Sequence, residues 1–256
     1  MLHCMKLNRD PFEKIKSGSK TIEMRLFDEK RQRISVGDFI EFSSADNLPK
    51  KIQTRVTALH RFSSFEELYS AFPKEKKLGY SPADTADAHD MEEYYSLDKQ
   101  KGYGVVGIEL RMTDLQKYID AQEKGYDFGE PYQTALSEIK NGRKITHWIW
   151  YVFPQIQGLG WSGITAYFSI RDIIEATDYY EHPVLGARLI EITEALYELN
   201  CYDLVSVLGL TDALKLRSCM TLFNRAIPQQ QLFKKVLDKY CQGMEDDKTL
   251  RALNLI

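Results

Sequence analysis

The spacing of hydrophobic residues changes once along the chain, after Arg111, and no other feature restricts the fold as strongly. Upstream, residues 51–62 alternate apolar and polar side chains, and residues 103–111 are rich in valine and isoleucine, as expected of β-strands. Downstream, apolar residues recur at helical spacing in successive segments. The sequence therefore predicts an α+β protein with a β-rich domain over residues 1–111 and an all-helical domain over residues 113–256.

The charge of the chain is close to balanced. It holds 34 basic and 37 acidic residues, a formal net charge of -3. Residues 1–111 carry 19 basic and 18 acidic side chains, a net +1, and the remainder carries 34 − 19 = 15 basic and 37 − 18 = 19 acidic ones, a net -4. The whole molecule therefore has no strong attraction for nucleic acid, and any such binding must come from a local group of residues.

The chain has no apolar run long enough to span a membrane, and we expect a cytoplasmic protein without a membrane partner. Its cysteines show no CxxC spacing, and His147 and His182 lack a third ligand at any usual spacing. We therefore expect neither a metal nor a cofactor. The sequence makes no prediction of the oligomeric state.

The segment GSKTIEMR gathers three charged residues close to a predicted turn. Gly18 is placed to end the preceding helix, and a strand then begins near Lys20. Because strand side chains alternate between faces, Glu23 and Arg25 point the same way, and Lys20 joins them only if the corner between helix and strand rotates it inward. The segment is either an ion pair on an exposed sheet or part of a polar pocket.

The same eight residues resemble the G-x-K-x-x-E-x-R signature of the ASCH domain family. The flanking segments also fit, namely MKLNRDPFEKIKSG, DEKRQRISVGDFIEF and YGVVGIEL, so that the resemblance covers roughly residues 1–111. It implies a small PUA-like β-barrel with flanking helices. It also implies a role with RNA or modified nucleosides.

The chemistry of such a pocket has two versions. For binding, Arg25 offers a planar donor fork to a phosphate or a carbonyl edge, Lys20 offers a point charge, and Glu23 holds Lys20 or accepts from a base amino group. For catalysis, Lys20 acts as a base with Glu23, and a downstream acid comes from Glu66 or Glu67. Some bacterial ASCH proteins are amidohydrolases that remove the acetyl group of N4-acetylcytidine, but they have a threonine where this chain has Glu23.

Further residues complete the predicted nucleic-acid surface of the first domain. Arg31 belongs to its basic neighbourhood, and four tyrosines are candidates for stacking on a base, namely Tyr80, Tyr94, Tyr95 and Tyr103.

A second group of unusual segments lies in the predicted helical domain. THWIWYVFPQIQGLGWS holds all three tryptophans, and together with EHPVLGARL and LKLRSCMTLF it resembles the DUF1810 family over residues 113–256. That family is all-helical and functionally uncharacterised. Polar residues embedded in these aromatic segments are candidates for binding an anion or a nucleotide, namely His147, Trp150, Gln155, Lys215 and Arg217.

Three functions are compatible with the sequence. The first is binding of RNA, a nucleotide or a modified nucleoside through the ASCH pocket. The second is hydrolysis of an acylated nucleoside such as N4-acetylcytidine. The third is a non-catalytic interaction or nucleotide-sensing module. The sequence favours the first function and leaves open whether the protein is an enzyme.

Overall fold

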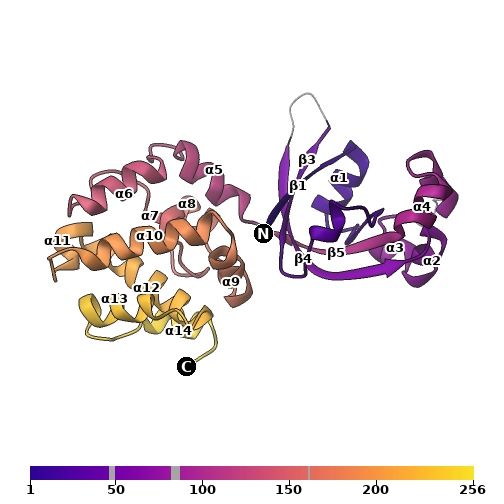
Figure 1. The fold of residues 1–256 in the computed structure, drawn as a ribbon. Helices are drawn as coiled ribbons and strands as arrows, with labels where there is room; N and C mark the ends of the chain where they lie inside the picture. The colour runs from indigo at the N-terminus through magenta and orange to yellow at the C-terminus, as the bar shows by residue number, and fades with distance from the viewer. Residues whose placement is uncertain (46–49, 82–86, 161) are drawn as a thin grey trace. The chain divides into compact units, whose positions relative to one another are not determined.

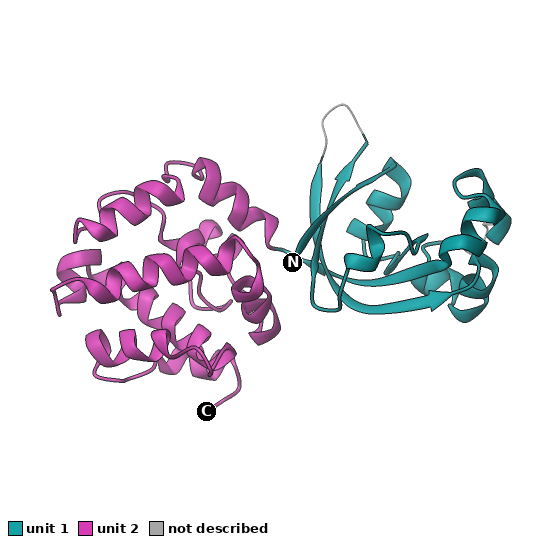
Figure 2. Cartoon of the chain, viewed as in Figure 1, with its two compact units in different colours: residues 1–114 teal, residues 115–256 magenta. Residues whose placement is uncertain are grey.

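The computed structural model describes residues 1–45, 50–81, 87–160 and 162–256. The chain divides into two compact units, residues 1–114 and residues 115–256 (Figure 2). The first unit is built around a sheet and the second consists of helices, so the α+β fold predicted from the hydrophobic spacing is confirmed.

The first unit contains one five-stranded sheet in the order β1-β3-β4-β5-β2. Strands β1 (Leu2–Leu7) and β3 (Phe39–Ser44) pair in parallel, and the other neighbours are antiparallel. The sheet curls into a half-barrel in which β1 and β2 (Ile22–Leu26) form the two edges (Figure 1). This matches the small β-barrel that the resemblance implies.

The long strand β4 (Lys51–Phe62) contains the irregularity that helps the sheet to curl. It pairs with β5 (Val105–Thr113), and the register shifts between Val56 and Ala58. An extra residue in one strand of an antiparallel pair bends that strand and increases its twist. The edges β1 and β2 are thereby brought around the helix α1 (Arg9–Lys16), which lies against the sheet (Figure 1).

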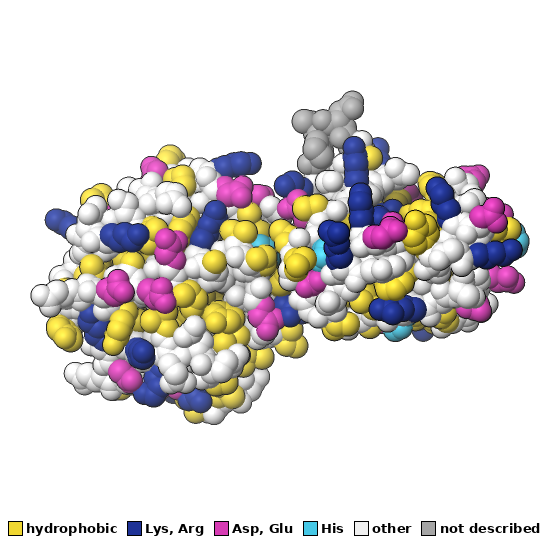
Figure 3. All heavy atoms as spheres, viewed as in Figure 1, with side chains coloured by type: hydrophobic (Ala, Val, Ile, Leu, Met, Phe, Trp, Pro, Cys, Tyr) yellow, Lys and Arg dark blue, Asp and Glu magenta, His cyan; other side chains and the backbone are white. Residues whose placement is uncertain are grey.

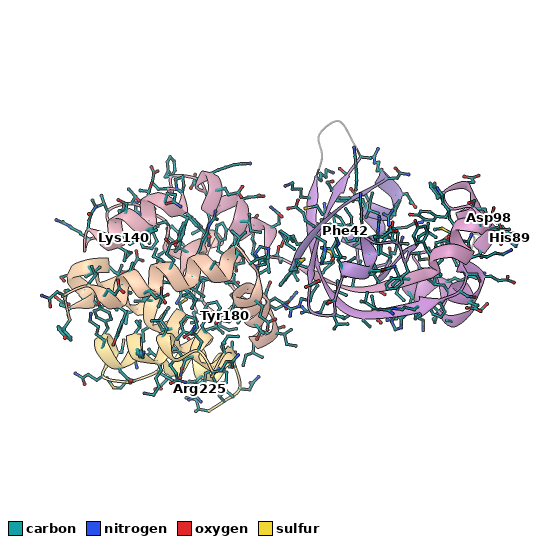
Figure 4. The ribbon with its side chains drawn as sticks, in the orientation of Figure 1. Phe42, His89, Asp98, Lys140, Tyr180 and Arg225 are labelled. Carbon is teal, nitrogen blue, oxygen red and sulfur yellow. The ribbon has the colours of Figure 1, made fainter. Side chains whose placement is uncertain are left out.

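Two hydrophobic clusters stabilise this unit. In the first, Phe12 and Ile15 of α1 pack with inward residues of the sheet such as Phe42, which is fully buried (Figure 4). In the second, strand β2 packs against α2 (Phe65–Ala71). The remaining short helices of the unit are η1 (Arg31–Arg33), α3 (Lys74–Lys77), η2 (Ala88–Glu93) and α4 (Leu97–Tyr103).

The end of β5 differs from the expected domain boundary. The strand continues to Thr113, whose hydroxyl donates to the carbonyl oxygen of Gln53 at 3.1 Å, and the first helix of the second unit begins at Gln116. The helical domain is predicted to begin at residue 113. The pairing of Thr113 with Gln53 in the β4–β5 ladder explains why the strand extends two residues further than the apolar pattern.

In its described residues the second unit consists of helices joined by loops, with one isolated β-bridge between Ile156 and Ile170. Helix α12 (Leu210–Ala226) packs against α9 (Ile173–Glu181), α13 (Gln231–Cys241) and the short α7 (Ile149–Val152). The other helices are α5 (Gln116–Lys124), α6 (Tyr132–Lys140), α8 (Gly163–Tyr167), α10 (Leu185–Glu198), α11 (Leu204–Leu208) and α14 (Asp247–Ala252). The aromatic segment forms part of the core, because Trp148, Tyr151 and Phe153 are fully buried.

The buried His182 caps the start of α10. Its Nδ1 atom accepts hydrogen bonds from the backbone N–H groups of Val184 and Leu185 at 3.2 and 3.3 Å. Burial, together with the positive charge of Arg188, lowers the pKa of His182 from 6.5 to about 4. The imidazole is therefore neutral at neutral pH, as an acceptor at Nδ1 must be.

We predict that His182 makes the helical unit sensitive to acid. In the unfolded chain the histidine binds a proton as the pH falls through about 6.5, whereas in the folded chain it stays neutral until about pH 4, so stability decreases across this interval as the pH falls. Between pH 7 and pH 5 the loss is roughly 2 kcal/mol. Urea unfolding followed by tryptophan fluorescence measures it, because all three tryptophans lie in this unit.

The control is His182→Asn, which keeps an acceptor at the cap but does not titrate. Its stability is expected to change less between pH 7 and pH 5 than that of the unchanged protein. Equal losses in the two proteins would show that His182 does not cause the acid sensitivity.

Candidate functional site

The corner between α1 and β2 brings Lys20 inward. Gly18 adopts a φ of 80° directly after the helix, and its N–H donates to the carbonyl oxygen of Ile15 at 3.0 Å. The backbone N–H of Lys20 then donates to the carbonyl oxygen of Lys14 at 3.0 Å, and Lys20 forms an isolated bridge with Leu78. Lys20 is only 8% exposed as a result. The corner between α1 and β2 therefore turns Lys20 inward, as a polar pocket requires.

Lys20, Glu23 and Arg25 form an ion triad in which Lys20 and Glu23 are buried and Arg25 is partly exposed. Glu23 Oε2 lies 2.8 Å from Lys20 Nζ, and Glu23 Oε1 lies 2.8 Å from Arg25 Nε. Arg25 Nη1 donates to the hydroxyl of Tyr95 at 3.2 Å, and Nη2 donates to the carbonyl oxygen of Lys6 at 3.4 Å. Because Lys6 belongs to β1 and Arg25 to β2, this arginine links the two edges of the curled sheet.

The electrostatics of the triad favour its charged form. Burial raises the pKa of Glu23, but the attraction of Lys20 and Arg25 outweighs it and holds that pKa below the usual value. Burial likewise lowers the pKa of Arg25, and the Glu23 carboxylate raises it above its usual value. Glu23 is therefore ionised at neutral pH, and the triad carries one net positive charge.

A cavity of about 460 Å³ lies at the triad, between the edges of the sheet. Its volume falls in the range of small-molecule sites, roughly 300–1,000 Å³. The charged residues in its lining are four basic and two acidic ones, a net charge of 4 − 2 = +2, namely Lys6, Lys14, Lys20, Arg25, Asp10 and Glu23. This cavity therefore has the local positive charge that the molecule as a whole lacks. The visible face of the molecule carries its basic side chains dispersed over both units (Figure 3).

Three tyrosines form an aromatic wall of this cavity, namely Tyr80, Tyr94 and Tyr95. The first two of these differ in how firmly they are held. Tyr80 shares a hydrogen bond of 2.5 Å with the hydroxyl of Tyr69, whereas Tyr94 is 63% exposed. The ring of Tyr95 stacks on Phe65 at 5.7 Å. Tyr103, the fourth stacking candidate, lies at the end of α4 and does not line the cavity.

The close approach of Gly79 to Lys20 was not expected from the sequence. Gly79 has a φ of 80°, and a Cβ atom at this position would lie 2.8 Å from Lys20 Cβ. Only glycine therefore allows the chain to pass so near to Lys20. The sequence offers only a glycine before Tyr80 in a polar segment, which does not identify Lys20 as the neighbour.

Three predicted site residues of the first unit lie outside the lining of this cavity. Glu66 and Glu67 are exposed in the first turn of α2, where Glu67 accepts a hydrogen bond from the backbone N–H of Ser63 at 2.9 Å. Their negative charges stabilise the N-terminus of α2 by capping its backbone and by interacting with the helix dipole. Arg31 pairs with Asp28 at 2.9 Å in the turn of η1. These three residues are not part of the cavity lining.

In the helical unit, three of the five predicted residues come together. Lys215 Nζ lies 4.7 Å from the ring centroid of Trp150, and the rings of His147 and Trp150 are 6.4 Å apart. Asp212, which the sequence did not single out, lies 2.8 Å from Lys215 Nζ and 2.8 Å from Lys144 Nζ. These side chains form a cationic and aromatic cluster.

The other two predicted residues of this unit have structural contacts. Arg217 donates to the backbone carbonyl oxygens of Met244 and Glu245 at 3.0 and 2.5 Å, and it thereby fixes the chain before α14. The backbone carbonyl oxygen of Gln155 accepts from the N–H of Ile170 at 2.8 Å. Trp161, the third tryptophan of the aromatic segment, lies outside the described residues.

Among the described residues, no helix is both long and apolar enough to cross a membrane. The same residues contain no group of three or more histidine, cysteine, aspartate or glutamate side chains placed to hold a metal ion.

The curled sheet with a cationic cavity between its edges places the first unit in the class of PUA-like domains, which is associated with RNA binding. The model of the ASCH domain matches residues 5–114. The model of the family described as a protein of unknown function, DUF1810, matches residues 112–253. The chain thus belongs to the DUF1810 family and carries an ASCH domain before the DUF1810 domain.

Solved structures are similar to parts of this chain. The conserved hypothetical protein Rv1873 from Mycobacterium tuberculosis is 37% identical, with a TM-score of 0.52, over 56% of this chain and 98% of its own. Two others are each 32% identical over 44% of this chain and 99% of their own. These are hypothetical protein PH0355, with a TM-score of 0.37, and protein PF0455 from Pyrococcus furiosus, with a TM-score of 0.35. No curated protein matches the chain.

We predict that the triad is coupled energetically. Glu23→Gln removes the one anion between two largely buried cations and is expected to lower the free energy of unfolding of the first unit by roughly 3–5 kcal/mol. Adding Lys20→Met is expected to recover part of this loss, because a buried unpaired cation leaves with it. Amide hydrogen exchange of β2 and β5 under native conditions measures both effects, and Lys16→Met, at an exposed lysine of α1, is the control. Additive effects of the two substitutions would contradict the coupling.

We also predict that two glycines with the same backbone conformation respond differently to alanine. Gly18 and Gly79 both have a φ of 80°, so each substitution strains the backbone by about 1–2 kcal/mol. A Cβ atom at Gly18 would meet no atom within 4 Å, whereas at Gly79 it would press on Lys20. Gly79→Ala is therefore expected to destabilise the unit more than Gly18→Ala and to shift the backbone amide resonances of residues 20–25. Similar spectra for the two variants would show that Lys20 is not held by this contact.

Proposed function

We propose that the ASCH unit binds RNA through a single nucleotide, or binds a free nucleotide or modified nucleoside, in the cavity between the edges of its sheet. The observation that carries this proposal is the buried triad of Lys20, Glu23 and Arg25 at a cavity of about 460 Å³. The association of PUA-like domains with RNA binding supports it.

Burial of the triad is itself an argument for function. A carboxylate and the two cations that contact it lose much of their hydration here, and apolar side chains of similar size in such a place are often neutral or stabilising. Fold stability alone therefore gives little reason to keep these charges at a cavity. A ligand with phosphate or carbonyl oxygens gives a reason, because desolvated cations bind such groups strongly.

The tyrosine wall adds a second part to the site. Single nucleotides of RNA are recognised by stacking of the base on aromatic rings combined with hydrogen bonds to its edges. The exposed ring of Tyr94 is available for such stacking, and Tyr95 connects the wall to the triad through its hydrogen bond with Arg25. Charge and stacking surface thus lie on the same cavity.

Hydrolysis of an acylated nucleoside receives less support than binding. A base or nucleophile at Lys20 must lose a proton, which would leave the buried carboxylate of Glu23 with one cation in place of two. The expected downstream acids, Glu66 and Glu67, are exposed on α2. A non-catalytic interaction module receives less support as well, because it requires a surface and not a cavity that leads to buried charges.

We predict that Tyr94→Ala weakens nucleoside or RNA binding roughly tenfold without loss of stability, because base stacking on an aromatic ring contributes about 1–3 kcal/mol and this ring is exposed. Isothermal titration with cytidine, N4-acetylcytidine and a short single-stranded RNA measures the change. The matched control is Tyr103→Ala, another partly exposed tyrosine of the same unit that does not line the cavity.

Two results would contradict the proposal. The first is the absence of binding by any of these ligands, as judged also by the amide resonances of residues 20–25. The second is conversion of N4-acetylcytidine to cytidine that is lost in Lys20→Arg, which would establish the hydrolase in place of a binding module.

A further inference from the structure

We infer that the ligand of the cavity bears a phosphomonoester, so that it is either a free nucleoside monophosphate or the phosphorylated end of an RNA chain. This inference rests on the proposed function and makes it more specific. It follows from the hydrogen-bond donors of the triad, from the accessibility of its three side chains and from the charge of the cavity lining.

The triad presents several hydrogen-bond donors and few acceptors to a ligand. Lysine has three N–H groups and arginine has five. In the described part of the chain, Lys20 Nζ and Arg25 Nε each lie at ion-pair distance from Glu23, and Arg25 donates to Tyr95 and to Lys6 through its two Nη atoms. At least two N–H groups therefore remain on each cation. Tyr95 accepts from Arg25, which leaves its own hydroxyl proton available to a ligand.

The carboxylate is less accessible than the cations. The side chain of Arg25 is 18% exposed and that of Lys20 is 9% exposed, whereas that of Glu23 is 4% exposed. Both oxygens of Glu23 already face a cation, and Oε2 is buried. A ligand therefore meets the guanidinium group before it meets the carboxylate. This arrangement favours an acceptor-rich group as the ligand. It disfavours the amino group of a base, the partner of Glu23 that the sequence suggests.

The charge of the lining matches a dianion. The cavity lining carries a net charge of +2, from four basic and two acidic residues. A phosphomonoester carries about −1.5 to −2 charges at neutral pH, whereas each phosphodiester within an RNA chain carries one. The dipole of α1, whose positive end lies at Asn8 in the cavity lining, acts in the same direction, and the opposing charge of Asp10 is already included in the net +2.

The side chain of Lys6 allows this inference to be tested without disturbing the triad. Lys6 is an exposed residue of β1 that lines the cavity, and its contact with Arg25 is made by its backbone carbonyl oxygen. Lys6→Ala therefore removes one positive charge from the lining and keeps the backbone contact. Lys16→Ala is the matched control, because Lys16 is also exposed and does not line the cavity.

The experiment compares ligands that differ only in the phosphate. The full-length protein is titrated calorimetrically with the four ribonucleoside 5′-monophosphates, with the four nucleosides, and with inorganic phosphate. At least one monophosphate is expected to bind roughly tenfold or more tightly than its nucleoside and than inorganic phosphate. Lys6→Ala is expected to weaken the binding of that monophosphate several-fold and to leave the binding of its nucleoside unchanged. Lys16→Ala is expected to change neither affinity.

A second comparison distinguishes the two sources of the phosphomonoester. One short RNA is prepared with a 5′-phosphate, with a 3′-phosphate and with hydroxyl groups at both ends. Tighter binding of a phosphorylated form than of the monophosphate identifies an RNA end as the ligand, and the reverse order identifies a free nucleotide. Both results support the inference.

The outcomes against the inference separate it from the proposed function. Equal affinity for a nucleoside and its monophosphate, with resonance changes at residues 20–25, overturns the phosphomonoester and leaves the proposed function standing. If inorganic phosphate binds as tightly as the monophosphates, the site recognises an anion and not a nucleotide, and the inference is overturned. Absence of binding by every ligand overturns the inference and the proposed function together.

Discussion

The contact of one carboxylate, Glu23, with two cations is the interaction on which the site depends. A buried carboxylate is costly unless it is paired, and here Lys20 and Arg25 each lie 2.8 Å from it. The pairing requires Lys20 to be turned inward at the end of α1, and Arg25, beside Glu23 on β2, also donates to the carbonyl oxygen of Lys6 on β1. The local conformation after Gly18 and the curl of the sheet are thus both linked to the same group of atoms.

Two members of the triad could be placed together from the sequence, and the third could not. Glu23 and Arg25 are two residues apart on one strand, and the alternation of side chains places them on one face. Lys20 lies outside the strand, and its direction is set by a hydrogen bond to Lys14 and a bridge to Leu78, residues that no local pattern connects to it. The rest of the cavity is harder still, because its lining residues come from β1, α1, β2 and the segment that contains Tyr80 and Tyr94.

In the helical unit, polar residues near the aromatic segment are predicted to bind a ligand, but a polar residue that the sequence did not single out, Glu138, has a structural role there. Glu138, on α6, accepts from the backbone N–H groups of Ile145 and Thr146 and from the indole N–H of Trp148 at 2.8 Å. The buried carboxylate thereby fixes the loop that leads into α7, and these bonds, against the effect of burial, lower the pKa of Glu138. The helical spacing of apolar residues predicted the helices of this unit. The sequence does not, however, distinguish polar groups that hold a loop from polar groups that bind a ligand.

The two units contain the same arrangement of a carboxylate between two cations, and comparison of the two shows what makes one of them a stronger candidate site. Asp212 pairs with Lys144 and Lys215 at 2.8 Å, much as Glu23 pairs with its cations. Lys144, however, also donates to the carbonyl oxygen of Thr146, and Lys215 lies over the ring of Trp150, so that both ammonium groups are directed at the protein. At Glu23, by contrast, the cations retain N–H groups beside a cavity. Pairs of buried charges therefore indicate a binding site only where donors remain and space for a ligand adjoins them.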